Sequence, residues 1–158
     1  MDQKQLNKIL DNHQLWLDTN GIDGRRANFE RSNLQGVNLE GANLRGAKLQ
    51  YVYLQDANLS YADLSYANLS CAKLSFANLT GASLKGAELE RACLQFTNLE
   101  DADLEYVTLM GGSIYGANVT IELRKIKKIM DCKISRDQLP WLALHPNFSK
   151  FHKTLKVP

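Results

Sequence analysis

The chain of 158 residues carries a formal net charge of +2, is 44% hydrophobic and 23% charged, and contains three cysteines. These values are typical of a single soluble domain, and no apolar run approaches the roughly 18 residues of a membrane span. The first twenty residues contain no continuous apolar stretch, which argues against a secretory signal. Three cysteines without regular spacing favour free thiols and a reducing compartment. We therefore expect a cytoplasmic protein that does not bind membranes.

Residues 1–24 carry the pattern of an amphipathic helix. Their larger apolar residues recur at intervals of three and four, so that they share one side of a helix. Asp2 is a suitable N-cap, and Asn20-Gly21 is a suitable stop. The pattern predicts a helical cap for the segment that follows.

A strict repeat fills the middle of the chain. From Phe29 to Val119 a large apolar residue stands at every fifth position, nineteen times in succession, and a small residue, usually alanine, stands two positions earlier. A period of five matches neither the 3.6 residues of a helix nor the two of a strand, which predicts a larger coil. The three prolines, which would remove backbone donors, all lie outside the repeat.

The repeat has the form A-(N/D)-L-x-x, as in residues 57–61 and 67–71. Over residues 25–121 it resembles the pentapeptide-repeat family. The resemblance implies an all-β solenoid, a right-handed quadrilateral β-helix with four repeats per coil and just under five coils. The chain then divides into an N-terminal helical cap (1–24), the β-helix (25–121) and a C-terminal helical cap or tail (122–158).

With four repeats per coil, residues twenty apart stack in columns. One column consists only of asparagines. An amide can donate a hydrogen bond to one neighbour in such a column and accept one from the other, as in other stacked β structures. We predict a structural ladder that supports the stacking of the coils, formed by Asn38, Asn58, Asn78, Asn98 and Asn118.

The outward-facing columns contain the candidate interaction residues. One column places Phe76 directly beneath Phe96, and tyrosines occupy equivalent corner positions elsewhere. Exposed aromatic side chains on a rigid scaffold can anchor an interface, although at a corner they can also simply cover the edge of the coil. An acidic cluster near one end adds negative charge, which the cations Lys85 and Arg91 partly offset. The candidate interaction surface consists of Phe76, Phe96, Tyr51, Tyr61, Tyr66, Tyr106, Asp101, Asp103 and Glu105.

The C-terminal part is basic. Residues 122–158 hold nine basic and three acidic groups, a net +6, whereas residues 25–121 hold eight basic and ten acidic groups, a net −2. A helical pattern places four apolar residues on one face, and an apolar patch follows. This segment can cap the last coil or form a homodimer, and the sequence leaves both open. The apolar residues concerned are Leu123, Ile126, Ile129, Met130, Leu139, Trp141 and Leu142.

Direct nucleic-acid binding is not expected, because the basic residues after residue 121 fit a solvated helix face. No catalytic constellation is apparent either. All three histidines lie outside the repeat, and Cys132, His145 and His152 do not have zinc-ligand spacing. A coil interior filled with leucine and alanine leaves no space for a ligand. We therefore expect no enzyme activity, no metal and no cofactor.

Three functions fit this sequence. The first is a non-catalytic protein-interaction scaffold with an unidentified protein partner. The resemblance implies a second, a DNA mimic that binds a type II topoisomerase such as DNA gyrase and protects it from quinolones or toxins. Mimicry of duplex DNA needs dense, regular negative charge, which a body of net charge −2 lacks. The third is a structural protein that stacks end to end in an assembly.

Overall fold

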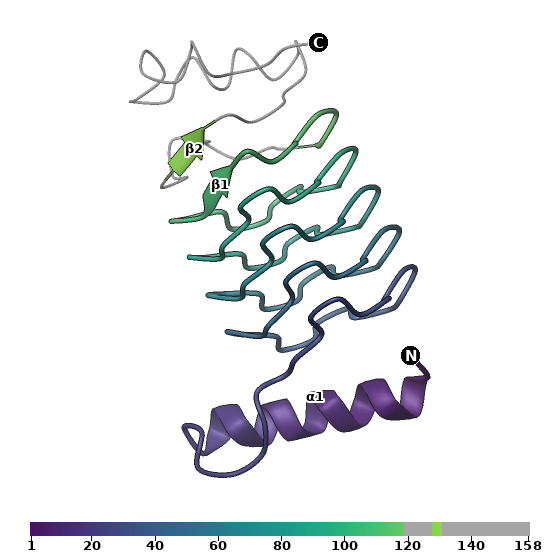
Figure 1. Cartoon of the computed structure of the whole chain (residues 1–158), viewed down its shortest axis with the longest axis vertical. Coiled ribbons are helices and arrows are strands. Elements are labelled where there is room, and N and C mark those ends of the chain that lie inside the picture. Colours follow the sequence, from purple (N-terminus) through teal and green to yellow (C-terminus); the bar gives the residue numbers. More distant parts are fainter. Residues whose placement is uncertain (119–127, 131–158) are drawn as a thin grey trace.

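The structure is a computed structural model that describes residues 1–118 and 128–130. Helix α1 (Gln3–Asp18) comes first, then a stack of coils, in which only β1 (Thr108–Met110) and β2 (Lys128–Met130) are longer strands among the described residues (Figure 1). Asp2 caps the helix as predicted, since its Oδ1 accepts from Gln5 N at 2.7 Å. No helix in the described ranges has the length and apolar character to cross a membrane.

Each coil takes twenty residues. Parallel bridges join residues twenty apart in four columns, beginning with the pairs Asn28 and Lys48, Asn33 and Tyr53. Outside β1, each bridged repeat contributes a single residue to its column, because a turn follows at once. The predicted solenoid with four repeats per coil is therefore confirmed, while its right-handed sense stays a prediction.

The turns require a left-handed backbone at each corner. The N–H of Ala62 donates to the carbonyl of Leu59 at 3.1 Å, and φ of the intervening Tyr61 is +58°. A positive φ at the third residue of a turn, but not at the second, is the pattern of a type II turn, where glycine is favoured. Nevertheless only seven of these corner residues are glycines, namely Gly36, Gly41, Gly46, Gly81, Gly86, Gly111 and Gly116.

The interior of the coils is apolar and closed. The central residues of the repeats from Phe29 to Ile114 are at most 5% exposed, and burying one leucine side chain stabilises the fold by about 1.5–3 kcal/mol. Most small residues two positions earlier are buried beside them. Thr97 replaces alanine in this inner layer, and its Oγ1 donates to the carbonyl of Leu74 at 2.7 Å.

Helix α1 lies across the first coil (Figure 1). Its Leu6 and His13 are buried. Ala27 N donates to Nδ1 of His13 at 3.2 Å, which ties the helix to the first repeat. The connecting segment runs close to the helix, because a Cβ on Gly24 would overlap the carbonyl oxygen of Asn12.

The predicted C-terminal helix is wrong where the structure describes it. Ile129 and Met130 lie in β2, which pairs in parallel with β1 and places Ile129 opposite Leu109. This is the same twenty-residue register, so the ladder extends beyond the predicted boundary at residue 121. The edge of a coil presents main-chain N–H and C=O groups that favour such pairing, and a short apolar run fits either a helix or a strand. The rest of this prediction lies outside the described residues, namely Leu123, Ile126, Leu139, Trp141 and Leu142.

Candidate functional site

Phe76 and Phe96 form an exposed aromatic stack on one corner of the solenoid. Their ring centroids are 5.2 Å apart and the ring planes differ by 11°. Tyr115 meets Phe96 edge to face at 5.7 Å. The side chains of Phe76 and Phe96 remain 61% and 48% exposed. We call Phe76, Phe96 and Tyr115 the aromatic stack. Tyr115 was not among the predicted site residues, because only the orientation of its ring in the structure links it to Phe96.

The four predicted corner tyrosines do not gather with this stack. Tyr51 and Tyr61 belong to two different columns, and Tyr66 and Tyr106 share a third column two coils apart. Each is about half exposed or more. Three of them have a cation above the ring, in the pairs Arg31 with Tyr51, Arg45 with Tyr66 and Lys85 with Tyr106, at 5.4 to 5.9 Å from the centroid.

Tyr61 and Tyr66 pack against glycines of the next coil. A Cβ placed on Gly81 would lie 2.6 Å from Cε1 of Tyr61, and one on Gly86 would lie 2.8 Å from Cδ1 of Tyr66. These rings therefore cover the backbone at their corners. Phe76 differs, since the residue at its corner in the next coil is Phe96 and the two rings present a continuous aromatic surface.

The predicted acidic residues lie in the fourth coil and are partly compensated. Glu105 Oε2 forms an ion pair with Nζ of Lys85 at 2.7 Å. The hydrogen bond that Lys85 donates to Glu105, followed by the negative charge of Glu105, raises the pKa of Lys85 above its ordinary value. Oδ1 of Asp103 accepts from the main-chain N–H of Glu105 at 2.9 Å. Part of the acidic cluster, which also includes Asp101, therefore stabilises local structure.

The predicted asparagine ladder is formed mostly by direct amide contacts. In three of its four steps Nδ2 of one asparagine donates to Oδ1 of the asparagine one coil earlier, at 3.2 to 3.3 Å. At the remaining step Asn98 donates to Oγ1 of Thr80 at 3.0 Å. The Oδ1 atoms also accept from the main chain two residues further on, as Asn58 does from Ser60 N.

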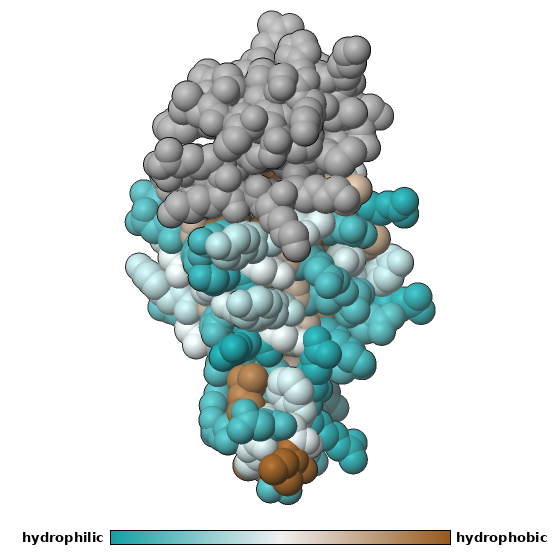
Figure 2. All heavy atoms as spheres, turned by 90° about the vertical axis from the view of Figure 1, so that its left-hand side faces the viewer, coloured by the Kyte–Doolittle hydropathy of each residue, from teal (hydrophilic) through white to brown (hydrophobic). Residues whose placement is uncertain are grey.

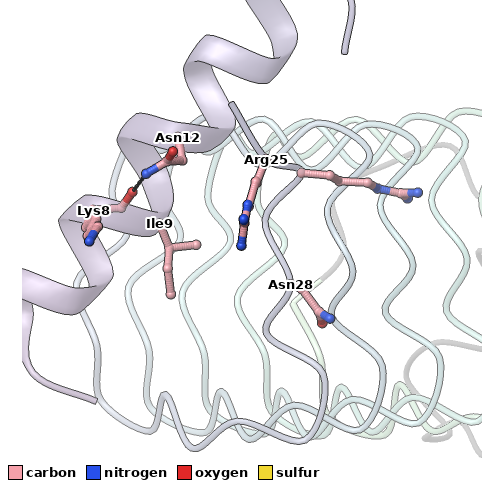
Figure 3. A pocket seen from close by; sticks show the side chains of 6 residues that line it. Lys8, Ile9, Asn12, Arg25 and Asn28 are labelled. Atoms are coloured by element: carbon pink, nitrogen blue, oxygen red, sulfur yellow. Dashed lines mark hydrogen bonds between the residues drawn. The ribbon is translucent and has the colours of Figure 1, made fainter. Parts of the chain in front are cut away.

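The sequence reasoning missed a groove between α1 and the first coil. Its volume is about 540 Å³, and its lining residues include Lys8, Arg25 and Arg26 (Figure 3). A second hollow of about 430 Å³ lies on Trp16, Arg45 and Tyr66. The adjacent Arg25-Arg26 pair was the available signal, but its position beside α1 depends on how the helix packs.

Apolar surface is limited on the side shown in Figure 2. The coils present mostly polar side chains there, and the most hydrophobic colour gathers at the lower end of the molecule. Ile22, in the loop after α1, is 85% exposed.

Cys71 and Cys93 are free thiols. Within residues 1–118 and 128–130, no three His, Cys, Asp or Glu side chains are grouped closely enough to hold a metal ion.

The comparisons with known proteins agree with this architecture. The family model for pentapeptide repeats matches the chain in eight copies, over residues 18–46, 25–60, 38–70 and 67–105. No curated protein matches the chain. A solved structure from the cyanobacterium Nostoc PCC 7120, the pentapeptide repeat protein alr5209, is 30% identical with a TM-score of 0.60, over 75% of this chain and 91% of its own.

Two further solved structures are similar. HetL, a pentapeptide repeat protein involved in heterocyst differentiation regulation in Nostoc sp. strain PCC 7120, is 25% identical with a TM-score of 0.61, over 77% of this chain. The match spans about half (51%) of the length of HetL. Full-length QnrB1, a plasmid-mediated fluoroquinolone resistance protein, is 17% identical with a TM-score of 0.61, over 86% of this chain and 68% of its own, and shares the fold. The repeat, its twenty-residue coil register and these matches establish that the chain belongs to the pentapeptide-repeat family.

Proposed function

We propose that the chain is a non-catalytic scaffold that binds a protein partner through the aromatic stack. The observation that carries this proposal is the 61% and 48% exposure of two stacked phenylalanine rings on a hydrogen-bonded coil. Large aromatic side chains dominate the binding energy of protein interfaces, and a rigid surface loses little conformational entropy on binding.

The scaffold role depends on the stability of both ends of the coil. We take α1 to be the N-terminal cap of a right-handed quadrilateral β-helix, because the helix packs Leu6 and His13 against the first coil. A solenoid needs such caps to keep its terminal apolar interior from water. A fixed coil end would keep the aromatic stack in one geometry.

The test compares two double variants of the full chain. Phe76→Ala with Phe96→Ala removes the stack, and Tyr51→Ala with Tyr106→Ala removes two aromatic residues of similar exposure, 49% and 56%, at other corners. After circular dichroism and thermal unfolding have shown that both variants are folded, each is used to capture partners from its native cells. We expect the phenylalanine variant to lose a partner that the tyrosine variant keeps. Equal capture by both variants would contradict the proposal.

A second candidate function rests on the acidic cluster. Four of the six residues from Glu100 to Glu105 are carboxylates, and such a cluster could imitate DNA phosphates toward a type II topoisomerase. The ion pair of Lys85 with Glu105 reduces the local charge. This candidate predicts that the purified chain relieves fluoroquinolone inhibition of DNA gyrase. The absence of any effect at micromolar concentration would exclude it.

A further inference from the structure

The groove between α1 and the first coil is lined by positively charged and polar side chains from both elements. Lys8, Ile9 and Asn12 line it from the helix, and Arg25, Arg26 and Asn28 line it from the segment that enters the coil. Figure 3 shows the Arg25 side chain pointing into the space between helix and coil, with Ile9 on the helix side and Asn28 on the coil side. The volume of about 540 Å³ is within the range that small ligands occupy.

The charge of this groove is unbalanced. Three of its six lining residues are cations and none is a carboxylate. Arg26 Nε donates to the carbonyl of Gly46, which engages one of the three. Within the part of the chain that the structure describes, Lys8 and Arg25 form no ion pair. All three positive charges therefore lack a counter-ion within the described residues, and Lys8 and Arg25 are the two whose side chains are not engaged by Gly46.

Hydrogen bonds fix the backbone from which these side chains project. Arg25 N donates to the carbonyl of Asn12 at 3.0 Å, and Nδ2 of Asn12 donates to the carbonyl of Lys8 at 2.7 Å. Oδ1 of Asn28 accepts from Glu30 N at 3.0 Å, which directs its amide and leaves Nδ2 available as a donor. Because these bonds use main-chain atoms, the side chains of Lys8 and Arg25 are not needed to keep the helix against the coil.

We propose that this groove binds a phosphomonoester group. A guanidinium can donate two parallel hydrogen bonds to phosphate oxygens, and an ammonium adds a further charge-assisted bond. A phosphomonoester carries about −1.5 to −2 charges at pH 7, which matches the charges of Lys8 and Arg25. A single carboxylate would neutralise only one of these two cations. The site lies beside α1, away from the aromatic stack, and does not depend on the proposed protein-binding function.

The experiment titrates the full chain at physiological ionic strength by NMR and calorimetry. The probes are inorganic phosphate, O-phosphoserine, and vesicles that contain phosphatidic acid, with acetate as a monoanionic comparator. Arg25→Gln should weaken binding about tenfold, the factor expected from the loss of one charge-assisted hydrogen bond. Arg91→Gln is the matched control, because it removes the same charge from an exposed arginine outside the groove.

Binding of phosphate or phosphoserine that falls in Arg25→Gln but not in Arg91→Gln supports the site and identifies a soluble ester as its source. Binding of vesicles alone, with the same sensitivity, supports the site and identifies a lipid headgroup. Equal weakening in both variants, or equal binding of acetate, overturns the proposal as general charge attraction. No binding at millimolar probe concentration also overturns it. Circular dichroism of both variants verifies that the fold is intact.

Discussion

The ring of Tyr61 lies across Gly81, the residue at the same corner of the next coil, so closely that a Cβ on Gly81 would be 2.6 Å from Cε1 of the ring. Phe96 has the same relation to Gly116. An aromatic ring on a glycine covers backbone that no side chain of its own protects. Gly81 is therefore constrained twice, by its φ of +65° and by the ring beside it.

Gly81→Ala should consequently destabilise the protein more than the same change at Gly41. Gly41 has a φ of +64° in the same column, but a Cβ there would meet no atom within 4 Å. Both variants should lose about 1–2 kcal/mol for the left-handed backbone. Gly81→Ala should lose about 1–3 kcal/mol more for the steric overlap. Urea unfolding gives both values, and equal losses would show that the tyrosine ring moves away freely.

The extra loss should depend on Tyr61. In a background of Tyr61→Ala, the added cost of Gly81→Ala should fall to that of Gly41→Ala, because the overlapping ring is absent. A double-mutant cycle measures this coupling directly. A coupling energy near zero would show that the cost of Gly81→Ala does not depend on Tyr61, despite their contact, and would contradict the prediction.

Thr97→Val should destabilise the coil by about 0.5–1.5 kcal/mol, the usual value of one hydrogen bond. The Thr97 side chain is fully buried, and its Oγ1 donates to the carbonyl of Leu74. Thr97→Ser keeps the hydroxyl and removes a methyl group, so it tests the packing contribution separately. If thermal unfolding shows no loss of stability for Thr97→Val, the buried hydroxyl makes no net contribution to the stability of the coil.

The attachment of α1 should weaken in acid. Burial lowers the pKa of His13 below its ordinary value of 6.5, the nearby main chain of Arg45 partly opposes this shift, and the charge of Arg26 adds to the lowering. The folded state therefore favours neutral His13, and the contribution of this preference to the free energy of unfolding is fully present above pH 6.5. It is lost as the pH falls from 6.5 toward the folded-state pKa. Protonation also places a hydrogen on Nδ1, which then cannot accept from Ala27 N.

Fluorescence of Trp16 reports this change, since its ring stacks on His13 at 5.6 Å. A background of Trp141→Phe removes the second tryptophan. His13→Gln, which can still accept from Ala27 N but does not titrate in this range, should lose the pH dependence of urea unfolding below pH 6.5. An unchanged slope in that variant would assign the acid effect to other groups.

Truncation should show what closes the last coil. A chain that ends at Met130 keeps β2, which pairs with β1, and should remain soluble. A chain that ends at Asn118 lacks β2 and should aggregate through the open edge and apolar interior. Size-exclusion chromatography with light scattering measures both, and comparison with the full chain tests the predicted homodimer. A soluble monomer from the shorter chain would show that the coil needs no cap there.

The repeat made much of the fold predictable. Leucine at every fifth position can be buried on all sides only in a closed coil, and the observed register of twenty follows from four such repeats. The asparagine column was likewise readable, because identical residues recur at that spacing. Ile129 was misread, since a few apolar residues at helical intervals do not reveal that a strand edge twenty residues earlier is available for pairing.

The candidate site was less predictable. The sequence shows that Phe76, Tyr61 and Tyr66 occupy corners and which residue stands one coil later, but their contacts depend on how each ring turns. The columns predicted Phe76 beneath Phe96, and the structure confirms it and adds that the two rings stack in parallel. Only the structure shows that the ring of Tyr61 lies on Gly81. Arg25 is a further case, because its groove exists only after α1 has packed against the coil.

The sequence by itself thus determined the coil, its interior and the columns that its surface residues occupy, because a five-residue period acts through local spacing and burial. The tertiary structure decided which rings cover backbone and which remain available, where β2 pairs, and that Lys8 and Arg25 face one groove. These features arise from contacts between residues about twenty apart or on separate elements. Such contacts depend on side-chain direction and helix packing, which a repeat period does not specify.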